Sequence, residues 1–304
     1  MPEIVAIGEA MVELNQPTAG APYAPGFGGD TSNAMIAARR AGASTGYISA
    51  VGDDPFGRSL LALWRDEGVD AAHVRIVPDA PTGVYFVTHG PNGHEFSYLR
   101  SGSAASRMTP ADVPVDALRS ARILHASGIS QAISSSAADA VFAAIDAARR
   151  ANVLVSYDTN LRLRLWPLAR ARAIMHEALR QADIALPGLD DAAQLTGLSD
   201  PDAIADFTLA LGPKIVALTL GKDGALVATP ERRERIAPKR VAALDATGAG
   251  DAFDGNFLAE YLRTGDPFAA GRFANAAAAL STLGYGAIAP LPTRAATLAM
   301  MGPP

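Results

Sequence analysis

Residues 245–251, with the sequence DATGAGD, have the residue types and spacing of an anion-binding turn. Apolar residues at helical spacing predict a helix directly after this run: Phe253, Phe257, Leu258, Tyr261 and Leu262. The first backbone N–H groups of a helix have no partner within it and lie at the positive end of its dipole, so they attract anions. Gly248 and Gly250 also lack side chains that would keep a ligand away from the backbone.

Asp251, the last residue of this run, has two interpretations. Beside a bound phosphate, its carboxylate would accept a proton from an attacking hydroxyl group. Alternatively, Asp251 caps the helix, because aspartate is favoured in the first helical turn. The chemistry of the residue alone leaves both interpretations open.

A second glycine-rich run, TLGKDG at residues 219–224, follows a predicted strand. A strand-end turn with a lysine suits the phosphates or the ribose of a nucleotide, and the alternative is a plain hairpin turn. The sequence has no GxxxxGK[ST] motif and no strand-linked GxGxxG motif. A Walker-type nucleotide hydrolase is therefore excluded, and a nicotinamide-dependent dehydrogenase is disfavoured.

The elements that must position these runs alternate between short apolar strands and helices. The predicted strands are 4–7, 45–51, 123–127, 153–158, 184–186 and 215–220. The predicted helices are 33–40, with Thr31 or Ser32 as its cap, and 58–67, 134–151, 168–181, 190–196, 248–263 and 267–283. This alternation predicts one doubly wound α/β domain, a parallel sheet with helices on its faces.

Two hairpins interrupt the alternation. The first pairs residues 84–87 with 96–99 around Pro91-Asn92-Gly93, because Asn-Gly permits the positive φ values of a tight turn. It predicts an excursion from the main sheet that could serve as a lid. The second pairs residues 225–229 with 235–238.

Composition narrows the function classes. The chain has 304 residues, no cysteine, and 31 acidic against 26 basic residues, which gives a formal net charge of −5. Disulfides, thiolate metal sites and cysteine nucleophiles are excluded, and the five histidines show no metal-binding spacing. The densest basic run, Arg232, Arg233 and Arg235, alternates with glutamates and predicts a solvated turn, so we expect no nucleic-acid partner.

The sequence gives no sign of a membrane or export segment. No apolar run approaches the length of a membrane-spanning helix. The amino-terminal residues MPEIVAIGEAM predict a strand rather than a signal peptide. We therefore expect no membrane partner and a cytoplasmic location.

Two motifs in the same order resemble the signatures of the PfkB, or ribokinase-like, carbohydrate kinases. The amino-terminal signature is GGDTSN at residues 28–33, followed by Ala41-Gly42 and by VGDDPFG at residues 51–57. The carboxyl-terminal signature is the run 245–251 with Ala252-Phe253. The resemblance covers nearly the whole chain. It implies a three-layer α/β/α sandwich over residues 1–304, with a mostly parallel sheet and a small β-rich lid at about 10–25 and 82–105.

The resemblance also implies roles for individual residues. Asp251 would be the catalytic base, and Gly248, Ala249 and Gly250 the anion hole. ATP, bound with Mg²⁺, would contact Asn160, Thr219, Gly221, Lys222, Gly224, Gly248, Ala249, Gly250 and Asn275. The family's magnesium-linked NxxE motif is altered to Gly188 and Asp191, so Asp191 is the candidate linked to Mg²⁺. Asp245 is the candidate for a monovalent cation, K⁺, which some relatives hold.

Two arginines suggest an acidic sugar. Arg100 follows Tyr98, Arg162 ends the run DTNLR, and together they could bind a carboxylate by paired hydrogen bonds. This pattern is similar to 2-keto-3-deoxygluconate kinases, which implies these substrate-contact positions: Gly29, Asp30, Asn33, Tyr85, Tyr98, Arg100, Arg162 and Asp251. A turn-forming role for Asp30 is the alternative to its binding a sugar hydroxyl.

The expected reaction is transfer of the γ-phosphoryl group of ATP to the primary hydroxyl of 2-keto-3-deoxygluconate. The main alternative is a kinase for fructose, another neutral sugar or a nucleoside. A remote alternative is a non-catalytic sensor of sugar or nucleotide, against which the intact GAGD run argues. The resemblance also implies a homo-oligomer, with the lid as a candidate subunit contact.

Overall fold

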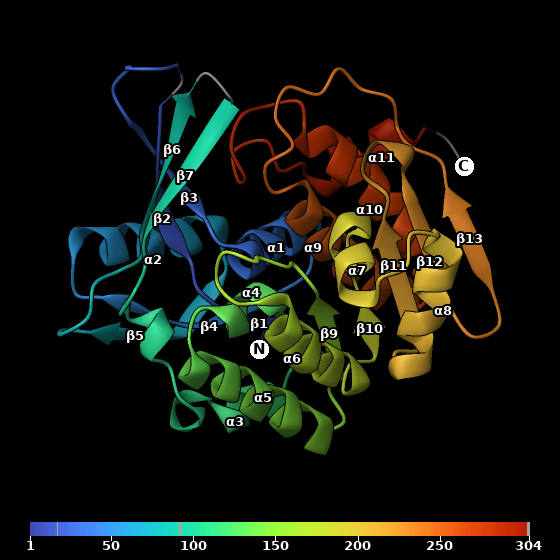
Figure 1. Cartoon of the computed structure of the whole chain (residues 1–304), viewed down its shortest axis with the longest axis horizontal. Helices are drawn as coiled ribbons and strands as arrows, with labels where there is room; N and C mark the ends of the chain where they lie inside the picture. Colours follow the sequence, from blue (N-terminus) through green and yellow to red (C-terminus); the bar gives the residue numbers. More distant parts are fainter. Residues whose placement is uncertain (17, 91–92, 303–304) are drawn as a thin grey trace.

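A nine-stranded sheet runs through the centre of the molecule (Figure 1). The computed structural model describes residues 1–16, 18–90 and 93–302. The strands of this sheet are β1 (Ile4–Ile7), β4 (Thr45–Gly52), β5 (Asp70–Val77), β8 (Ile123–Ser127), β9 (Leu154–Asp158), β10 (Ile184–Ala185), β11 (Ile215–Thr219), β12 (Ala225–Ala228) and β13 (Arg233–Ile236). Their order is β13-β12-β11-β10-β9-β8-β1-β4-β5. All neighbours from β11 to β5 pair parallel, whereas β12 and β13 form the predicted antiparallel hairpin at one edge.

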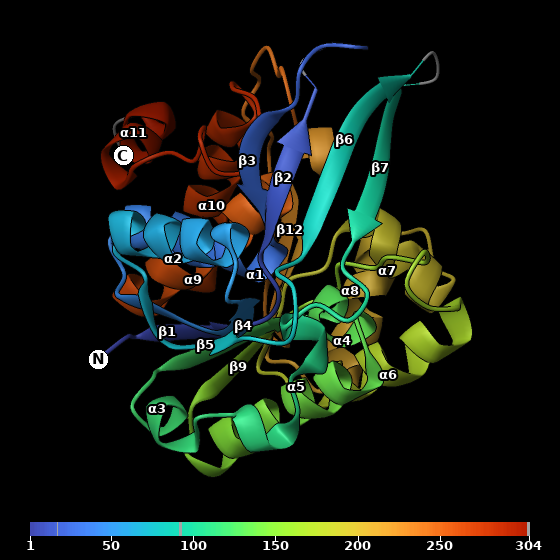
Figure 2. The same cartoon turned by 90° about the vertical axis from the view of Figure 1, so that its left-hand side faces the viewer.

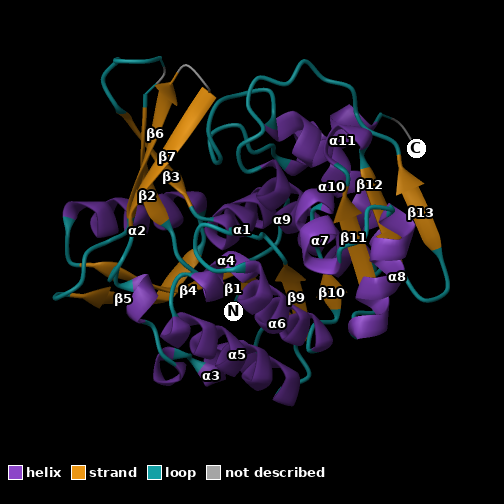
Figure 3. Ribbon diagram, viewed as in Figure 1, coloured by secondary structure: helices purple, strands orange, loops and turns teal. Residues whose placement is uncertain are grey.

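Helices cover both faces of this sheet (Figures 2 and 3). One face carries α1 (Asp30–Arg40), α2 (Pro55–Glu67), α9 (Ala249–Thr264) and α10 (Pro267–Ser281), with α11 (Arg294–Met301) against α10. The other carries α3 (Val115–Arg119), α4 (Gly128–Ala132), α5 (Ser135–Arg150), α6 (Leu168–Arg180), α7 (Leu189–Thr196) and α8 (Pro201–Leu211). Side chains alternate across a strand, so Ile4 and Ala6 of β1 join one core and Val5 and Ile7 join the other. The predicted three-layer sandwich is confirmed.

A second, four-stranded sheet stands away from the large one (Figure 2). It consists of β2 (Met11–Asn15), β3 (Ala24–Gly28), β6 (Val84–Gly90) and β7 (Gly93–Leu99), in the order β3-β2-β6-β7. The antiparallel pairing of β6 with β7 confirms the predicted hairpin. Its turn, predicted at Pro91-Asn92-Gly93, falls on residues 91–92, which lie outside the described residues.

Several local expectations need correction. The first helix begins at Asp30 with Gly29 as its N-cap, so Thr31 and Ser32 lie within the helix and do not cap it. The basic run is not wholly a turn, because Arg233 and Arg235 belong to β13 and pair with Asp202 of α8. Within residues 1–16, 18–90 and 93–302, every helix is too short or too polar to span a bilayer.

Candidate active site

The amino terminus of α9 has the anion-binding geometry that the glycine-rich run predicted. Gly248 precedes the helix with φ 73°, and a Cβ there would lie 2.9 Å from the Cβ of Ala287, so the position requires glycine. Ala252 donates the first helical bond, to the Gly248 carbonyl at 2.8 Å. The N–H groups of Gly250 and Asp251 precede that bond and have no acceptor within the helix. A Cβ on Gly250 would meet nothing within 4 Å, which leaves space for a ligand.

Asp251 is not the N-cap of this helix, because Gly248 holds that place and Asp251 occupies the third helical position. The capping interpretation is therefore wrong for the N-cap itself, but the carboxylate does lie in the first helical turn, where the helix dipole favours it. Nδ2 of Asn33 on α1 donates to Oδ2 of Asp251 at 2.8 Å. The pKa of Asp251 is raised to about 7, first by burial and then by the charge of Asp30, while the Asn33 hydrogen bond acts in the opposite direction.

A cavity of about 580 Å³ lies beside Asp251. Its size is typical of a small-molecule site, and it lies where the parallel strands of the large sheet end. Every predicted substrate position lines it: Gly29, Asp30, Asn33, Tyr85, Tyr98, Arg100, Arg162 and Asp251. Gly29 has φ 134°, and a Cβ there would lie 2.6 Å from the Glu9 carbonyl oxygen, so this wall also requires glycine.

A second cavity of about 570 Å³ lies on the other side of the α9 terminus. Seven of the nine predicted nucleotide positions line it: Thr219, Gly221, Lys222, Gly224, Ala249, Gly250 and Asn275. Nδ2 of Asn275 donates to the Ala237 carbonyl at 3.0 Å. Gly248 and Asn160 line the first cavity and not the second. The sequence reasoning missed Lys239 and Arg240, two basic residues of this second cavity.

The two cavities meet at the turn before α9. Four residues line both: Thr219, Ala246, Ala249 and Gly250. Asp251 faces only the first cavity, whereas the turn residues Gly221 and Lys222 face only the second. A molecule in one cavity would therefore reach a molecule in the other across the helix terminus, with a carboxylate on one side.

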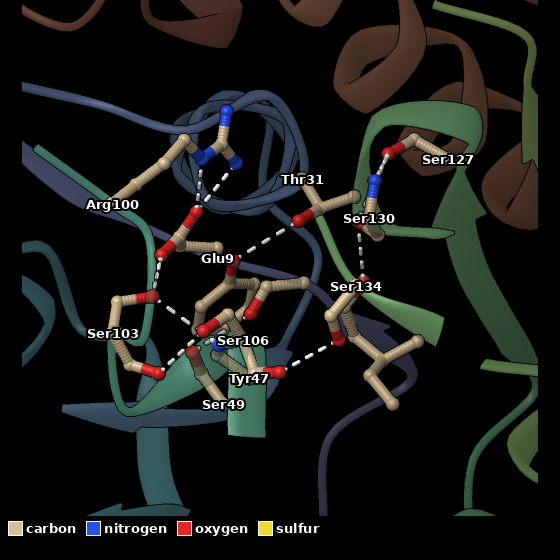
Figure 4. Close-up of polar contacts among 12 residues, drawn as sticks. Glu9, Thr31, Tyr47, Ser49, Arg100, Ser103, Ser106, Ser127, Ser130 and Ser134 are labelled. Carbon is tan, nitrogen blue, oxygen red and sulfur yellow. Dashed lines mark hydrogen bonds and ion pairs between the residues drawn. The ribbon is translucent and has the colours of Figure 1, made fainter. Parts of the chain in front are cut away.

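The arginines of the first cavity differ in their surroundings. Arg100 is nearly buried, with 10% of its side chain exposed, and its Nε donates to Oε2 of Glu9 at 2.8 Å (Figure 4). The Arg162 side chain is 49% exposed. It donates to the Leu161 carbonyl at 2.8 Å and lies 4.0 Å from Oδ2 of Asp191, a long ion pair. Sequence reasoning named both arginines but did not identify Glu9.

Four of the aspartates that line the first cavity are Asp30, Asp158, Asp251 and Asp254. Removal from water raises the pKa of all four, and the charges of the first three raise the pKa of Asp254 further. Nδ2 of Asn160 donates to Asp30 at 3.0 Å, and the Asn160 N–H donates to Asp158 at 3.0 Å. Asp254 was missed, although its position three residues after Asp251 places it on the same face of α9. This end of the cavity is therefore acidic.

The candidate cation residues lie near the turn before α9. Oδ2 of Asp191 accepts the Leu161 N–H at 2.8 Å and lines the first cavity. Asp245 accepts from Thr247 at 2.6 Å and from the Gly286 N–H at 2.9 Å, so it ties two loops together. Among the residues that the structure describes, no three acidic or histidine side chains form a metal cage. Mg²⁺ does not need three protein ligands, because it is usually bound by one or two carboxylates and completes its coordination shell with phosphates and water.

Comparison with known proteins places this geometry in a family. The sequence profile of the pfkB family of carbohydrate kinases matches residues 1–294. A 2-dehydro-3-deoxygluconokinase of Thermoproteus tenax is 39% identical over 290 residues, which cover 92% of this chain and 88% of that enzyme. A fructokinase-1 of Oryza sativa subsp. japonica is 34% identical over 98% of this chain and 97% of its own length.

A solved structure extends the match to three dimensions. The fructokinase of Vibrio cholerae O395, in a form that binds fructose, ADP and a calcium ion, superposes with a TM-score of 0.88. It is 30% identical and covers 98% of this chain and 99% of its own. A double mutant of that fructokinase has been solved with fructose, ADP and a potassium ion. This chain belongs to the pfkB family of carbohydrate kinases. Its fold is the ribokinase-like fold that the sequence predicted.

Proposed function

We propose that this carbohydrate kinase transfers the γ-phosphoryl group of ATP to the primary hydroxyl of a sugar acid, 2-keto-3-deoxygluconate. One observation carries the proposal: two cavities meet at Ala249 and Gly250, with the Asp251 carboxylate on one side of the junction. The second cavity would take ATP and the first the sugar. The sugar hydroxyl would then face the terminal phosphate along the line that displacement requires.

Asp251 would orient the attacking hydroxyl and accept its proton. A raised pKa suits this role, because a base works best when its pKa is near the working pH. The N–H groups of Gly250 and Asp251 would stabilise the negative charge on the transferring group. Mg²⁺, bound with ATP near Asp191, would neutralise phosphate charge. We also propose Asp245 as the residue nearest a monovalent cation.

The charges around the first cavity would orient a sugar acid. The Asp251 carboxylate, ionised when it acts as the base, would repel the acid group, whereas burial favours the neutral forms of Asp158 and Asp254. Arg162, with a half-exposed guanidinium, would attract it. A molecule with a carboxylate at one end and a primary hydroxyl at the other would therefore place the hydroxyl at Asp251.

The small sheet would act as a lid over the sugar. Tyr85 and Tyr98 extend from it into the lining of the first cavity, with their rings stacked 5.8 Å apart. Arg164, from the loop after β9, donates to the Phe96 carbonyl of β7 at 3.3 Å. We propose that residues 1–304 work as one domain in which this sheet excludes water during transfer.

A kinase for fructose is the second candidate, and the Glu9–Arg100 pair favours it. Because Glu9 offsets the charge of Arg100, the cavity presents less positive charge to a carboxylate than two arginines would. The fructokinase of Oryza sativa subsp. japonica, at 34% identity, supports the same candidate.

ADP release with Mg·ATP tests the two candidates. We would compare 2-keto-3-deoxygluconate, fructose, ribose and adenosine at matched concentrations. The proposal predicts that the sugar acid gives the highest kcat/KM, by about tenfold or more, the discrimination that one charge-assisted contact can supply. A higher value for fructose would establish the second candidate instead.

A further inference from the structure

Glu9 is a buried carboxylate beside the sugar cavity. It lies two residues after the end of β1, and only 2% of its side chain is exposed. Both of its carboxylate oxygens accept hydrogen bonds: Oε2 from Arg100, and Oε1 from the Ser103 hydroxyl (Figure 4). A Cβ on Gly83 would lie 2.9 Å from Oε1, so the backbone encloses the carboxylate on that side.

Arg100 is consequently held in one place. Its Nε and one terminal nitrogen both contact Oε2 of Glu9, and its guanidinium carbon lies 5.8 Å from the centre of the Tyr98 ring. The Arg100 backbone carbonyl also accepts the Ser103 N–H at 3.0 Å, which closes the loop that carries both partners of Glu9. One side of the guanidinium is therefore occupied, and its remaining N–H groups lie in the wall of the cavity.

Arg162 provides the contrast. Its side chain is 49% exposed against 10% for Arg100, and its distance to the nearest carboxylate, Asp191, is 4.0 Å. A close buried pair presents little net charge, whereas a loosely paired arginine keeps its charge for a ligand.

We propose that Glu9 is a positioning residue that offsets the charge of Arg100 and fixes its guanidinium in the cavity wall. The pair then donates hydrogen bonds to a sugar without adding net charge. The cavity then distinguishes an acidic from a neutral sugar through Arg162 rather than through Arg100. This inference rests on the proposed function for the identity of the acid. Its test uses the ratio of kcat/KM for 2-keto-3-deoxygluconate to kcat/KM for fructose, so it does not depend on which sugar the wild type prefers.

Glu9→Gln removes the negative charge and keeps an oxygen that accepts from Arg100. The ratio should rise about three- to tenfold over the wild type, because the cavity gains one positive charge at constant shape. Glu13→Gln is the matched control: Glu13 is also buried and accepts from Tyr85 at 2.6 Å, but it does not line the cavity. Its ratio should stay at the wild-type value. A Glu9→Gln ratio that also stays there would overturn the proposal.

The double variant Glu9→Gln with Arg100→Met gives a second test, which holds even if Glu9→Gln alone does not fold. Removing both charges leaves the net charge of the cavity unchanged, so the ratio should stay within about threefold of the wild type. Arg100→Met alone should lower the ratio about tenfold, because Glu9 then repels the acid. If the ratio for the double variant is as low as the ratio for Arg100→Met, Arg100 is the cation that binds the carboxylate, and the proposal is overturned. Failure of the wild type to phosphorylate the sugar acid would contradict the proposed function separately.

Discussion

Nδ2 of Asn33 donates to Oδ2 of Asp251 at 2.8 Å, across 218 positions of the chain. The bond joins the first turns of α1 and α9, which carry the two glycine-rich signatures of the sequence. One carboxylate oxygen is thereby held, and in the proposed reaction the other would meet the substrate hydroxyl. Asn33 is therefore the residue that orients the proposed base.

Asp251→Asn should lower kcat about 10²- to 10⁴-fold, because the hydroxyl then has no base to accept its proton. Steady-state ADP release at saturating sugar and Mg·ATP measures this loss. The KM for ATP should change much less, since the nucleotide cavity does not include Asp251. Turnover near the wild-type rate would remove Asp251 from the proposed role.

The same variant should be more stable than the wild type above neutral pH. Burial raises the pKa of Asp251 to about 7, so the folded state favours its protonated form. The cost of ionising it in the folded state therefore appears as the pH rises from about 4 to about 7 and is complete above that range. Thermal unfolding at about pH 8 should show Asp251→Asn melting a few degrees higher, and the difference should vanish near pH 4. An equal or lower melting temperature at the higher pH would argue against a strained, ionised carboxylate.

The pH profile of kcat/KM should fall on its acid side near pH 7. Asp251 must be ionised to act, and burial together with the charge of Asp30 raises its pKa to about 7. Asp30→Asn removes that charge, so the acid limb should move to lower pH even if the maximum rate drops. Glu13→Gln, a buried carboxylate outside the cavity, should leave the limb in place. A limb near pH 4 in the wild type would contradict the assignment.

Gly250→Ala separates the anion site from the fold. A Cβ at this position meets no atom within 4 Å, and alanine favours a helix by about 1 kcal/mol over glycine, so stability should hold or rise. The methyl group would enter the space where the transferring phosphate is proposed to bind. We expect kcat/KM to fall about tenfold or more with a melting temperature that is unchanged or higher. Unimpaired turnover would mean that phosphate does not approach this part of the backbone.

Arg162→Ala should raise the KM for the sugar acid about tenfold and leave the KM for fructose nearly unchanged. The control is Arg164→Ala, which removes a neighbouring arginine of the same cavity that is held by the Phe96 carbonyl. Arg164→Ala should affect both sugars alike. An equal rise in KM for both sugars in Arg162→Ala would show that this arginine does not bind the carboxylate.

Most of the architecture could be predicted, because buried parallel strands appear in sequence as apolar runs separated by helices. Exposed elements could not be predicted in this way. β5 lies at an edge of the sheet, and its sequence DAAHVRIV has no clear alternation of apolar and polar residues. α8 does carry a signal in the sequence, because Asp200 caps the helix and Pro201 follows at its first position. The glycine-rich runs pointed to the site because the backbone N–H groups that form it belong to the same short stretch of sequence. Glu9 was not foreseen, because its role depends on Arg100, which lies 91 positions away in the sequence.

Phosphorus NMR of the product formed from 2-keto-3-deoxygluconate and Mg·ATP tests the central claim most directly. The account predicts one new phosphomonoester signal, split into a triplet by the two protons of the primary carbon, together with stoichiometric ADP. A doublet would place the phosphate on a secondary hydroxyl, away from the geometry proposed around Asp251. Inorganic phosphate with no ester would contradict transfer to the sugar altogether.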